Sequence, residues 1–250
     1  MLNKTKGNPI SEERALELSK FAASINVPIT RYDLLSMALT HSSYAFEATK
    51  ASDKFIKHNE RIEFLGDSVL STIVSTYMFE HFRGLDEGKL TKFRAHLVCE
   101  GSLSKFAKEI HLGDYLLLGH GEELSGSRER PSILADAFEA VLGAIYLDCG
   151  LELATKYLLG LMQEEIDFVC THGIYDDYKS YLQEYLQQNG EVHIIYKITG
   201  STGLAHEKTF QANVSLDGKI LGSGEGKSKK EAEQQAAKDA LQRFGLSIRL

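Results

Sequence analysis

Three carboxylates recur within one short apolar stretch, residues 59–70, whose sequence is NERIEFLGDSVL. At about 100° per residue on a helix, Glu60, Glu63 and Asp67 fall within about 60° of one another, opposite an apolar stripe. An acidic face on a single helix is usually just exposed to solvent. Carboxylates gathered in front of a core-facing stripe are also typical of a site for a hard cation. This stretch alone leaves both interpretations open.

A second stretch, residues 133–146 with the sequence ILADAFEAVLGAIY, repeats the pattern. Asp136 and Glu139 are three residues apart and therefore share one helical face. The small residues Ala140 and Gly143 lie on the same side, so we expect another helix to approach there. Glycine inside a helix costs roughly 1 kcal/mol relative to alanine, which suggests a packing reason for Gly143.

Two such helices facing each other would bring four oxygen-donor side chains together. Carboxylate oxygens suit Mg²⁺ or Mn²⁺, whereas zinc would favour histidine or cysteine. Activation of water and Lewis-acid assistance at a phosphodiester are the chemistry that such a site supports. The expected metal-site residues are Glu63, Asp67, Asp136 and Glu139.

Several motifs carry a resemblance to a known family. Residues 59–70 resemble the signature stretch of the ribonuclease III family, and residues 134–148 resemble its second acidic segment. Residues 38–45 (ALTHSSYA) and 87–91 (EGKLT) also fit that family. The resemblance implies Mg²⁺-dependent cleavage of double-stranded RNA, with Mn²⁺ as a substitute. It also implies 5′-phosphate and 3′-hydroxyl ends, short 3′ overhangs, and a homodimer in which each site cuts one strand.

The same resemblance assigns roles to individual carboxylates. The four metal-site positions of the family correspond to the quartet given above, with Asp67 and Glu139 expected to be catalytic. Glu60 and Glu87 match acidic positions that the family places at the edge of the site or near the dimer partner.

Composition limits the class of protein. With 250 residues and 43% hydrophobic content, the chain can bury a core, and one or two domains are expected. No apolar run approaches the roughly 18 residues of a membrane span, and the first residues lack the apolar segment of a secretory signal. Three cysteines far apart in sequence are expected to be reduced and structural, which favours a cytoplasmic protein.

The charge is unevenly distributed along the chain. The net charge of −7 divides into −9 for residues 1–177 and +2 for residues 178–250. Local patches rather than the total decide phosphate binding, so an acidic catalytic part joined to a mildly basic part is consistent with a nuclease. Many acidic enzymes would show the same division.

The periodicity changes near residue 173. Residues 11–170 are expected to be almost entirely helical, which predicts an all-helical endonuclease domain over 1–172, a linker over 173–177 and a second domain over 178–250. The second domain is predicted to have the order α-β-β-β-α. Its expected elements are a helix at 179–189, strands at 192–199, 206–215 and 219–222, and a helix at 229–244.

Local signals refine the second domain. Asp217-Gly218 predicts a two-residue hairpin, and the stretch from Ser228 to Glu231 predicts a capping box. Residues 222–228 (GSGEGKS) fit neither a dinucleotide fingerprint nor a P-loop, since position 221 is leucine. We therefore expect a glycine-rich loop that delivers lysines to a helix N-terminus, where phosphate is favoured. A solvated lysine cluster is the alternative.

This second domain resembles a double-stranded RNA-binding domain. The resemblance places Gln183 and Glu184 of the first helix at minor-groove positions and His206 in the first strand–strand loop. Here Gly203–His206 lacks the proline that the family commonly has in that loop, which should loosen the loop. The lysines expected at major-groove phosphates are Lys227, Lys229 and Lys230.

The leading hypothesis is an endoribonuclease for double-stranded RNA that acts on ribosomal RNA precursors and structured messenger RNA in a bacterial cytoplasm. One alternative is a non-catalytic RNA-binding protein that kept the fold, against which the complete acidic quartet argues. Another is a metal-dependent hydrolase of some other phosphoester, against which the C-terminal module argues.

Overall fold

The computed structural model describes residues 6–52, 55–172, 178–187, 192–202 and 208–246. The chain divides into two compact units, Met1–Ile166 and Asp167–Leu250. The first is mostly helical, and the second holds a three-stranded sheet with helices. The predicted fold class, a helical part followed by an α-β-β-β-α module, is confirmed. The predicted linker over 173–177 lies outside the described residues, and the domain boundaries stay a prediction.

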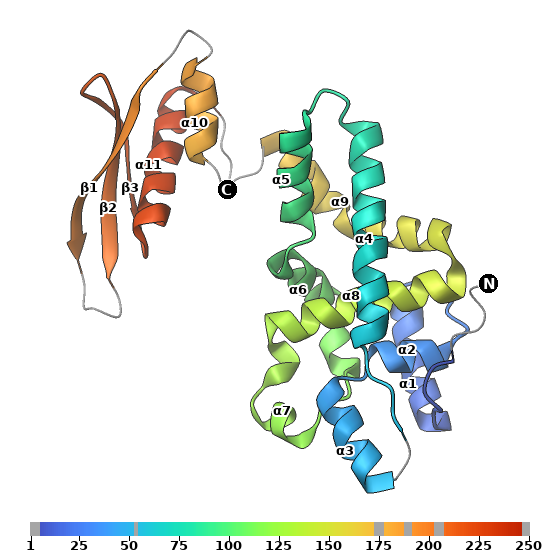
Figure 1. The fold of residues 1–250 in the computed structure, drawn as a ribbon. Helices are drawn as coiled ribbons and strands as arrows, with labels where there is room; N and C mark the ends of the chain where they lie inside the picture. Colours follow the sequence, from blue (N-terminus) through green and yellow to red (C-terminus); the bar gives the residue numbers. More distant parts are fainter. Residues whose placement is uncertain (1–5, 53–54, 173–177, 188–191, 203–207, 247–250) are drawn as a thin grey trace. The chain divides into compact units, whose positions relative to one another are not determined.

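The N-terminal unit is built from α-helices joined by short connections and 3₁₀ turns (Figure 1). Its helices are α1 (Glu12–Ser24), α2 (Tyr32–Ala38), α3 (Ser42–Ser52), α4 (Glu60–His81), α5 (Glu87–Leu97), α6 (Glu100–Glu109), α7 (His120–Leu124), α8 (Pro131–Cys149) and most of α9 (Leu151–His172), with 3₁₀ turns η2 (Leu112–Tyr115) and η3 (Ser127–Glu129).

Helix α8 is the centre of this unit. It is buried on most of its surface and packs against α2, α4 and α6. Pro131 occupies its first turn, where the missing N–H costs nothing, and Gly150 follows its end with a positive φ of 86°. The predicted apolar stripes are confirmed, since Ile62 and Val69 of α4 and Phe138 of α8 are all buried.

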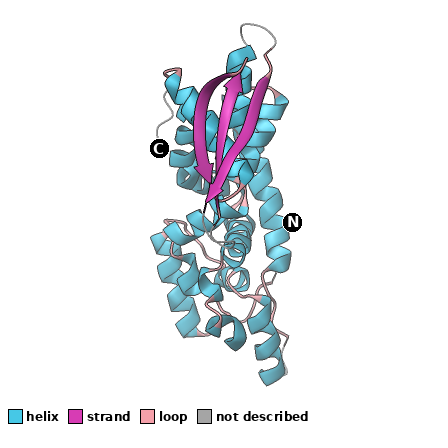
Figure 2. Ribbon diagram, turned by 90° about the vertical axis from the view of Figure 1, so that its left-hand side faces the viewer, coloured by secondary structure: helices cyan, strands magenta, loops and turns pink. Residues whose placement is uncertain are grey.

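The C-terminal unit is a sheet covered on one face. Strands β1 (Ile194–Thr202), β2 (Thr209–Leu216) and β3 (Lys219–Gly226) form an antiparallel sheet in the order β1-β2-β3. Helices α10 (Tyr178–Gln187) and α11 (Lys229–Arg243) lie together on one side of it, as Figures 1 and 2 show. The core between the layers contains Leu182, Val214, Leu241 and four alanines of α11.

Two local predictions for this unit are confirmed. Asp217 and Gly218 both have positive φ, 51° and 79°, as a tight hairpin turn of the type I′ class requires. The Ser228 hydroxyl accepts a hydrogen bond from the Glu231 N–H at 3.1 Å. The Glu231 carboxylate accepts a hydrogen bond from the Lys227 N–H at 2.7 Å, so the predicted capping box closes on the residue before the N-cap rather than on Ser228 itself.

The predicted glycine-rich loop is wrong, because residues 222–226 continue strand β3. Gly222, Gly224 and Gly226 lie on one face of the strand, directly against α11. A Cβ atom on Gly224 would lie 2.2 Å from the backbone nitrogen of Ala236. The glycines therefore serve close strand–helix packing, and the helix start at Ser228 follows the strand at once.

In the described ranges, no helix is long and apolar enough to cross a lipid bilayer. Among the described residues, Cys99 and Cys149 are free cysteines. Cys99 is exposed, and Cys149 is partly buried. Its sulfur lies near the Ser102 hydroxyl at the start of α6.

Candidate active site

The acidic faces of α4 and α8 meet because glycines let the two helices cross closely. A Cβ atom on Gly66 of α4 would lie 1.8 Å from the Glu139 carbonyl oxygen. A Cβ atom on Gly143 of α8 would lie 2.5 Å from the Ile62 carbonyl oxygen. The predicted packing reason for Gly143 is thus confirmed. Figure 1 shows α8 crossing α4 in the half of α4 that holds its N-terminus.

The crossing brings all four predicted carboxylates into one electrostatic cluster. Glu63 and Glu139 are partly buried, while Asp67 and Asp136 are exposed. Glu139 feels the charges of the other three members, and Glu63 feels those of Asp136 and Asp67. The quartet therefore comes from two helices whose stretches lie about 70 residues apart in sequence.

Burial and mutual repulsion raise the pKa values of the two partly buried carboxylates, Glu63 and Glu139. Burial is the largest cause for Glu63, and the charges of Asp136, Glu60 and Asp67 add to it, which raises its pKa from 4.5 to about 7. Burial is likewise the main cause for Glu139, whose pKa rises from 4.5 to about 7 with help from Asp67, Glu63 and Asp136. The neighbouring charges that raise the pKa values of Glu63 and Glu139 all belong to carboxylates, so like charges gather at this crossing.

A residue that the sequence did not indicate adds to this charge. Burial raises the pKa of Asp136, the charge of Glu100 raises it further, and His41 opposes the rise. Glu100 is the first residue of α6, which packs against α8. Glu100 lies outside the recognised motifs, and it comes near Asp136 because α6 packs against α8. His41 lies inside the stretch 38–45, and its residue type could have marked it as a candidate functional residue.

The donor set fits a hard divalent cation. Within the described residues, no three His, Cys, Asp or Glu side chains are already arranged as a closed ligand set. The quartet nevertheless supplies oxygen donors only, from two helices, at a place where burial and then like charges raise the pKa of Glu63 and that of Glu139. Oxygen-rich sites of this charge suit Mg²⁺ or Mn²⁺, which also keep several water ligands.

The two peripheral carboxylates occupy different places. Glu60 is exposed in the first turn of α4, its charge raises the pKa of Glu63, and it lies 3.6 Å from the His58 ring. Glu87 begins α5, beyond the opposite end of α4. From Glu63 to the last residue of α4 the helix rises about 27 Å, so Glu87 of the same chain stands far from the quartet.

The predicted RNA-binding residues of the C-terminal unit are on its surface. Gln183 and Glu184 are exposed on α10, and all three predicted lysines are exposed at the start of α11. His206 lies outside the described residues. Because the lysines follow directly after β3, their position is fixed by the capping box at Ser228 rather than by a loop.

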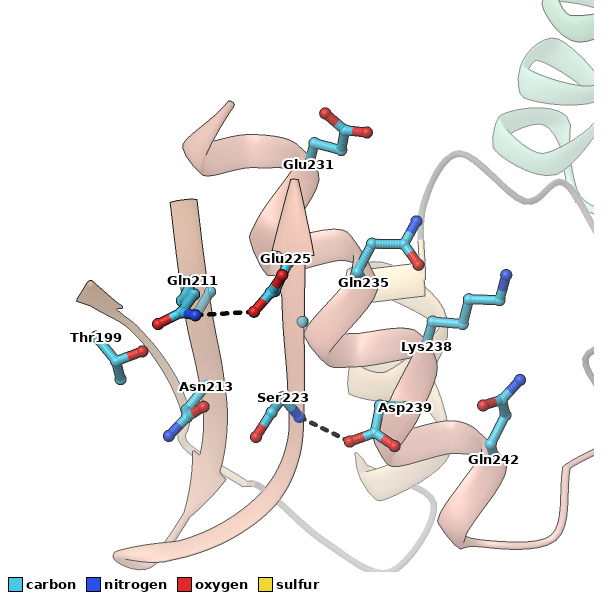
Figure 3. Close-up of a pocket in the computed structure, with 12 residues that line it drawn as sticks. Thr199, Gln211, Asn213, Ser223, Glu225, Glu231, Gln235, Lys238, Asp239 and Gln242 are labelled. Carbon is cyan, nitrogen blue, oxygen red and sulfur yellow. Dashed lines mark hydrogen bonds between the residues drawn. The ribbon is translucent and has the colours of Figure 1, made fainter. Parts of the chain in front are cut away.

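A groove of about 790 Å³ also opens in this unit, between the sheet and α11 (Figure 3). It is lined by polar side chains, and none of the predicted site residues is among them. Within it the Ser223 N–H donates to Asp239 at 2.8 Å, and Gln211 donates to Glu225 at 2.8 Å. The Ser223–Asp239 bond thus satisfies a backbone N–H of the edge strand β3.

Each of the two units matches a known protein family. Residues 32–165 match the family model described as ribonuclease-III-like, and residues 178–243 match that of the double-stranded RNA binding motif. The chain is 48% identical to ribonuclease 3 of Syntrophomonas wolfei over 223 residues, which cover 89% of this chain and 93% of the relative. It is 52% identical to ribonuclease 3 of Desulforamulus reducens over 209 residues, which cover 84% of each.

A solved structure is similar to the N-terminal part. The nuclease domain of ribonuclease III from Campylobacter jejuni superposes with a TM-score of 0.53 at 41% identity, covering 59% of this chain and 96% of that domain. That structure is described as showing flexibility in a region involved in dimer formation.

Proposed function

The chain belongs to the ribonuclease III family of double-strand-specific endoribonucleases, and we propose that Glu63, Asp67, Asp136 and Glu139 hold the divalent cations on which its cleavage depends. The observation that carries this proposal is the convergence of the quartet at the glycine-lined crossing of α4 and α8. Raised pKa values at Glu63 and Glu139 support it, because a divalent cation would relieve the repulsion that causes part of the rise.

The four carboxylates would share the work of the site in pairs. Bound Mg²⁺, or Mn²⁺ in its place, would activate water and stabilise the leaving 3′ oxygen, which gives 5′-phosphate and 3′-hydroxyl ends. The partly buried Glu63 and Glu139 fix the inner side of the site, and the exposed Asp67 and Asp136 face the RNA. Asp67 and Glu139, which belong to opposite helices and repel each other, are the expected catalytic pair.

The C-terminal unit is proposed to hold the duplex by its shape. Ammonium groups of Lys227, Lys229 and Lys230 and the N-terminus of α11 would contact phosphates across the major groove. Exposed Gln183 and Glu184 on α10 would face a minor groove. Contacts of this kind read duplex form and 2′-hydroxyls, so we expect weak sequence preference.

We further propose that the active form is a homodimer. Phe64 and Phe79 of α4 are each 76% exposed, and a second copy that packs against α4 would cover them. The dimer-forming region named for the Campylobacter jejuni nuclease domain supports the same state. A second copy also explains how Glu87 could belong to an active site, since it stands far from the quartet of its own chain.

Cleavage of a long RNA duplex with and without Mg²⁺ tests the function. We expect Glu139→Ala to abolish cutting while duplex binding, measured in Ca²⁺, persists. Glu164→Ala, an exposed change on α9, is the matched control and should cut like the wild type. Cutting without a divalent cation, or a fully active Glu139→Ala variant, would refute the assignment. Binding without cutting by the wild type would favour a non-catalytic RNA-binding protein.

In cells, we propose that the protein processes ribosomal RNA precursors and structured messenger RNA in a bacterial cytoplasm. The bacterial relatives named ribonuclease 3 that match over most of the chain support this setting. Cells without the protein should accumulate uncut precursors that contain long double-stranded stems. An unchanged RNA profile would argue against this role.

A further inference from the structure

Helix α10 is held in the C-terminal unit by a small apolar contact. Among its described residues, Leu182 alone is fully buried, in the core between the helices and the sheet. Tyr178, Tyr185 and Leu186 pack against that core but are only partly buried. Apolar contacts have no preferred direction, so one buried leucine restrains the rotation of a helix weakly. Directional polar contacts can supply the missing restraint.

Lys179, in the first turn of α10, makes such contacts with two neighbouring elements. Its ammonium group donates to the Glu233 carboxylate of α11 at 2.6 Å and lies 4.2 Å from the ring centre of Tyr196 on β1. Its backbone N–H, which has no partner within the first turn of a helix, donates to the Gln234 side chain of α11 at 3.1 Å. Lys179 and Glu233 are 32% and 24% exposed, so solvent screens their attraction less than that of an open surface pair.

The Lys179–Glu233 pair lies one helical turn from both groups of proposed RNA-binding residues. On α10, Gln183 follows Lys179 by four residues, and on α11, Lys229 precedes Glu233 by four. Residues four apart are neighbours on the same face of a helix. The pair therefore joins the two helices between the residues that each would present to RNA. It also compensates the negative charge of Glu233, which would otherwise stand beside Lys229.

We propose that Lys179 is a positioning residue for duplex recognition, which sets the distance between the minor-groove residues of α10 and the phosphate-binding lysines of α11. The inference rests on the proposed RNA-binding surface. An A-form RNA duplex presents its minor groove and its major-groove phosphates at a spacing that B-form DNA does not share. A protein that reads this spacing through two helices needs both helices held at one separation. Because Glu233 and Tyr196 hold the ammonium group, Lys179 makes no phosphate contact of its own.

Binding of RNA and DNA duplexes of equal length to the full chain, measured in Ca²⁺ over a range of KCl concentrations, tests this role. We expect Lys179→Met to weaken RNA binding roughly 10-fold, because a hydrogen bond between charged groups is lost, while the salt slope stays unchanged. DNA binding does not depend on the A-form spacing and should change less. Lys179→Arg keeps the charge and can stack on Tyr196, so it should bind RNA within about threefold of the wild type. Lys197→Met, an exposed change on β1, is the matched control.

Substitution of Glu233 separates positioning from a simple effect of charge. Glu233→Met removes a negative charge one turn from Lys229, so a pure charge effect would strengthen RNA binding. Loss of positioning instead predicts weaker binding, by about as much as in Lys179→Met. The double variant Lys179→Met/Glu233→Met should lose no more than either single variant, because both remove the same pair.

Several results would overturn the role of Lys179. These are stronger RNA binding by Glu233→Met, additive losses in the double variant, or a salt slope lowered by about one in Lys179→Met, which would make Lys179 a direct phosphate contact. Equal losses for RNA and DNA, with a lower melting temperature, would reduce Lys179 to a residue that only supports folding. If Lys179→Met does not fold, the sign of the Glu233→Met effect decides.

Failure of this inference is distinguishable from failure of the proposed RNA-binding surface. If replacing Lys229 and Lys230 together with alanine leaves RNA binding unchanged, the surface itself is wrong, and the role of Lys179 falls with it. If that double variant binds RNA weakly while Lys179→Met and Glu233→Met bind it like the wild type, the surface stands and only the role of Lys179 is refuted.

Discussion

At the scale of single residues, the partly buried carboxylates Glu63 and Glu139 determine how the site responds to pH. Both have pKa values raised from 4.5 to about 7 in the folded protein, first by burial and then by neighbouring carboxylates. A carboxyl group with a raised folded pKa binds more protons in the native state than in the unfolded state. Its contribution to stability is therefore present below pH 4.5 and is lost as the pH rises to about 7.

This linkage predicts a pH-dependent effect of Glu139→Gln, which replaces the carboxyl by a neutral group of equal size. Without divalent cations, the variant should be more stable than the wild type above pH 7. The difference should shrink toward zero as the pH falls to 4.5, where the native carboxyl is protonated. Thermal unfolding in a chelator, from pH 4 to 8, measures it.

Added Mg²⁺ supplies the control for that measurement. The cation should raise the melting temperature of the wild type more than that of Glu139→Gln, since it binds the native carboxylate cluster. An unchanged or lower melting temperature of the variant at pH 8 in chelator would mean that Glu139 is not held under repulsion.

At the scale of elements, the crossing of α4 and α8 is the feature that assembles the site. Gly66→Ala should destabilise the N-terminal unit by about 1–3 kcal/mol, because the new methyl group would overlap the Glu139 carbonyl oxygen. The helices would have to separate, so metal affinity and cleavage should fall as well. Urea unfolding and Mn²⁺ titration measure the two effects.

Gly160→Ala is the matched control for this substitution. Gly160 also lies inside a helix, α9, but a Cβ atom there meets nothing within 4 Å. Removing glycine from such a position should leave stability unchanged or raise it by up to about 1 kcal/mol. Equal behaviour of the two variants would show that the crossing at Gly66 tolerates a wider separation than its contacts indicate.

The same scale explains what the sequence could predict. Apolar periodicity indicated α4, α8 and α11, and the acidic residues on α4 and α8 followed from it. The three glycines of β3 indicated a loop by their individual preferences, and only the contact with α11 explains them as strand residues. Glu100 could not be foreseen, because helix packing brings it near Asp136 and no local pattern encodes that.

At the scale of the whole molecule, residues 1–177 have a net charge of −9 and residues 178–250 one of +2. This difference implies that the C-terminal residues carry much of the attraction to phosphate. Replacing Lys229 and Lys230 together with alanine should weaken duplex binding and lower the steepness of its salt dependence by about two, one for each lost phosphate contact. Dissociation constants measured in Ca²⁺ over a range of KCl concentrations give the slope.

Lys219→Ala is the control for the lysine pair. Lys219 is exposed at the β2–β3 hairpin, and its neighbours Asp217 and Gly218 form the turn. We expect this variant to bind duplex RNA with the slope of the wild type. An unchanged slope in the Lys229/Lys230 double variant would remove both lysines from the phosphate contacts.

A substitution of Glu87 tests whether two chains of a dimer contribute residues to the same active site. Within one chain it stands at the far end of α4 from the quartet, so a role in cleavage requires that it reach the site of a second copy. In such a dimer each active site combines the quartet of one chain with Glu87 of the other. Glu87→Lys should then lower cleavage by placing a positive charge at the edge of the site, although the quartet of the same chain is intact.

Mixing Glu139→Ala chains with Glu87→Lys chains shows whether this contribution crosses the dimer. If Glu87 acts in the site of the partner, a heterodimer of a Glu139→Ala chain and a Glu87→Lys chain has both substitutions in one active site. The other active site then contains only wild-type residues. We therefore expect the mixture, after unfolding and refolding together, to nick one strand of a duplex at a rate well above that of either variant alone. If Glu87 acts within its own chain, both sites of the heterodimer carry a lesion and mixing restores nothing. The same mixture without the unfolding step is the control, because homodimers that have not exchanged subunits should cut only at the rates of the separate variants.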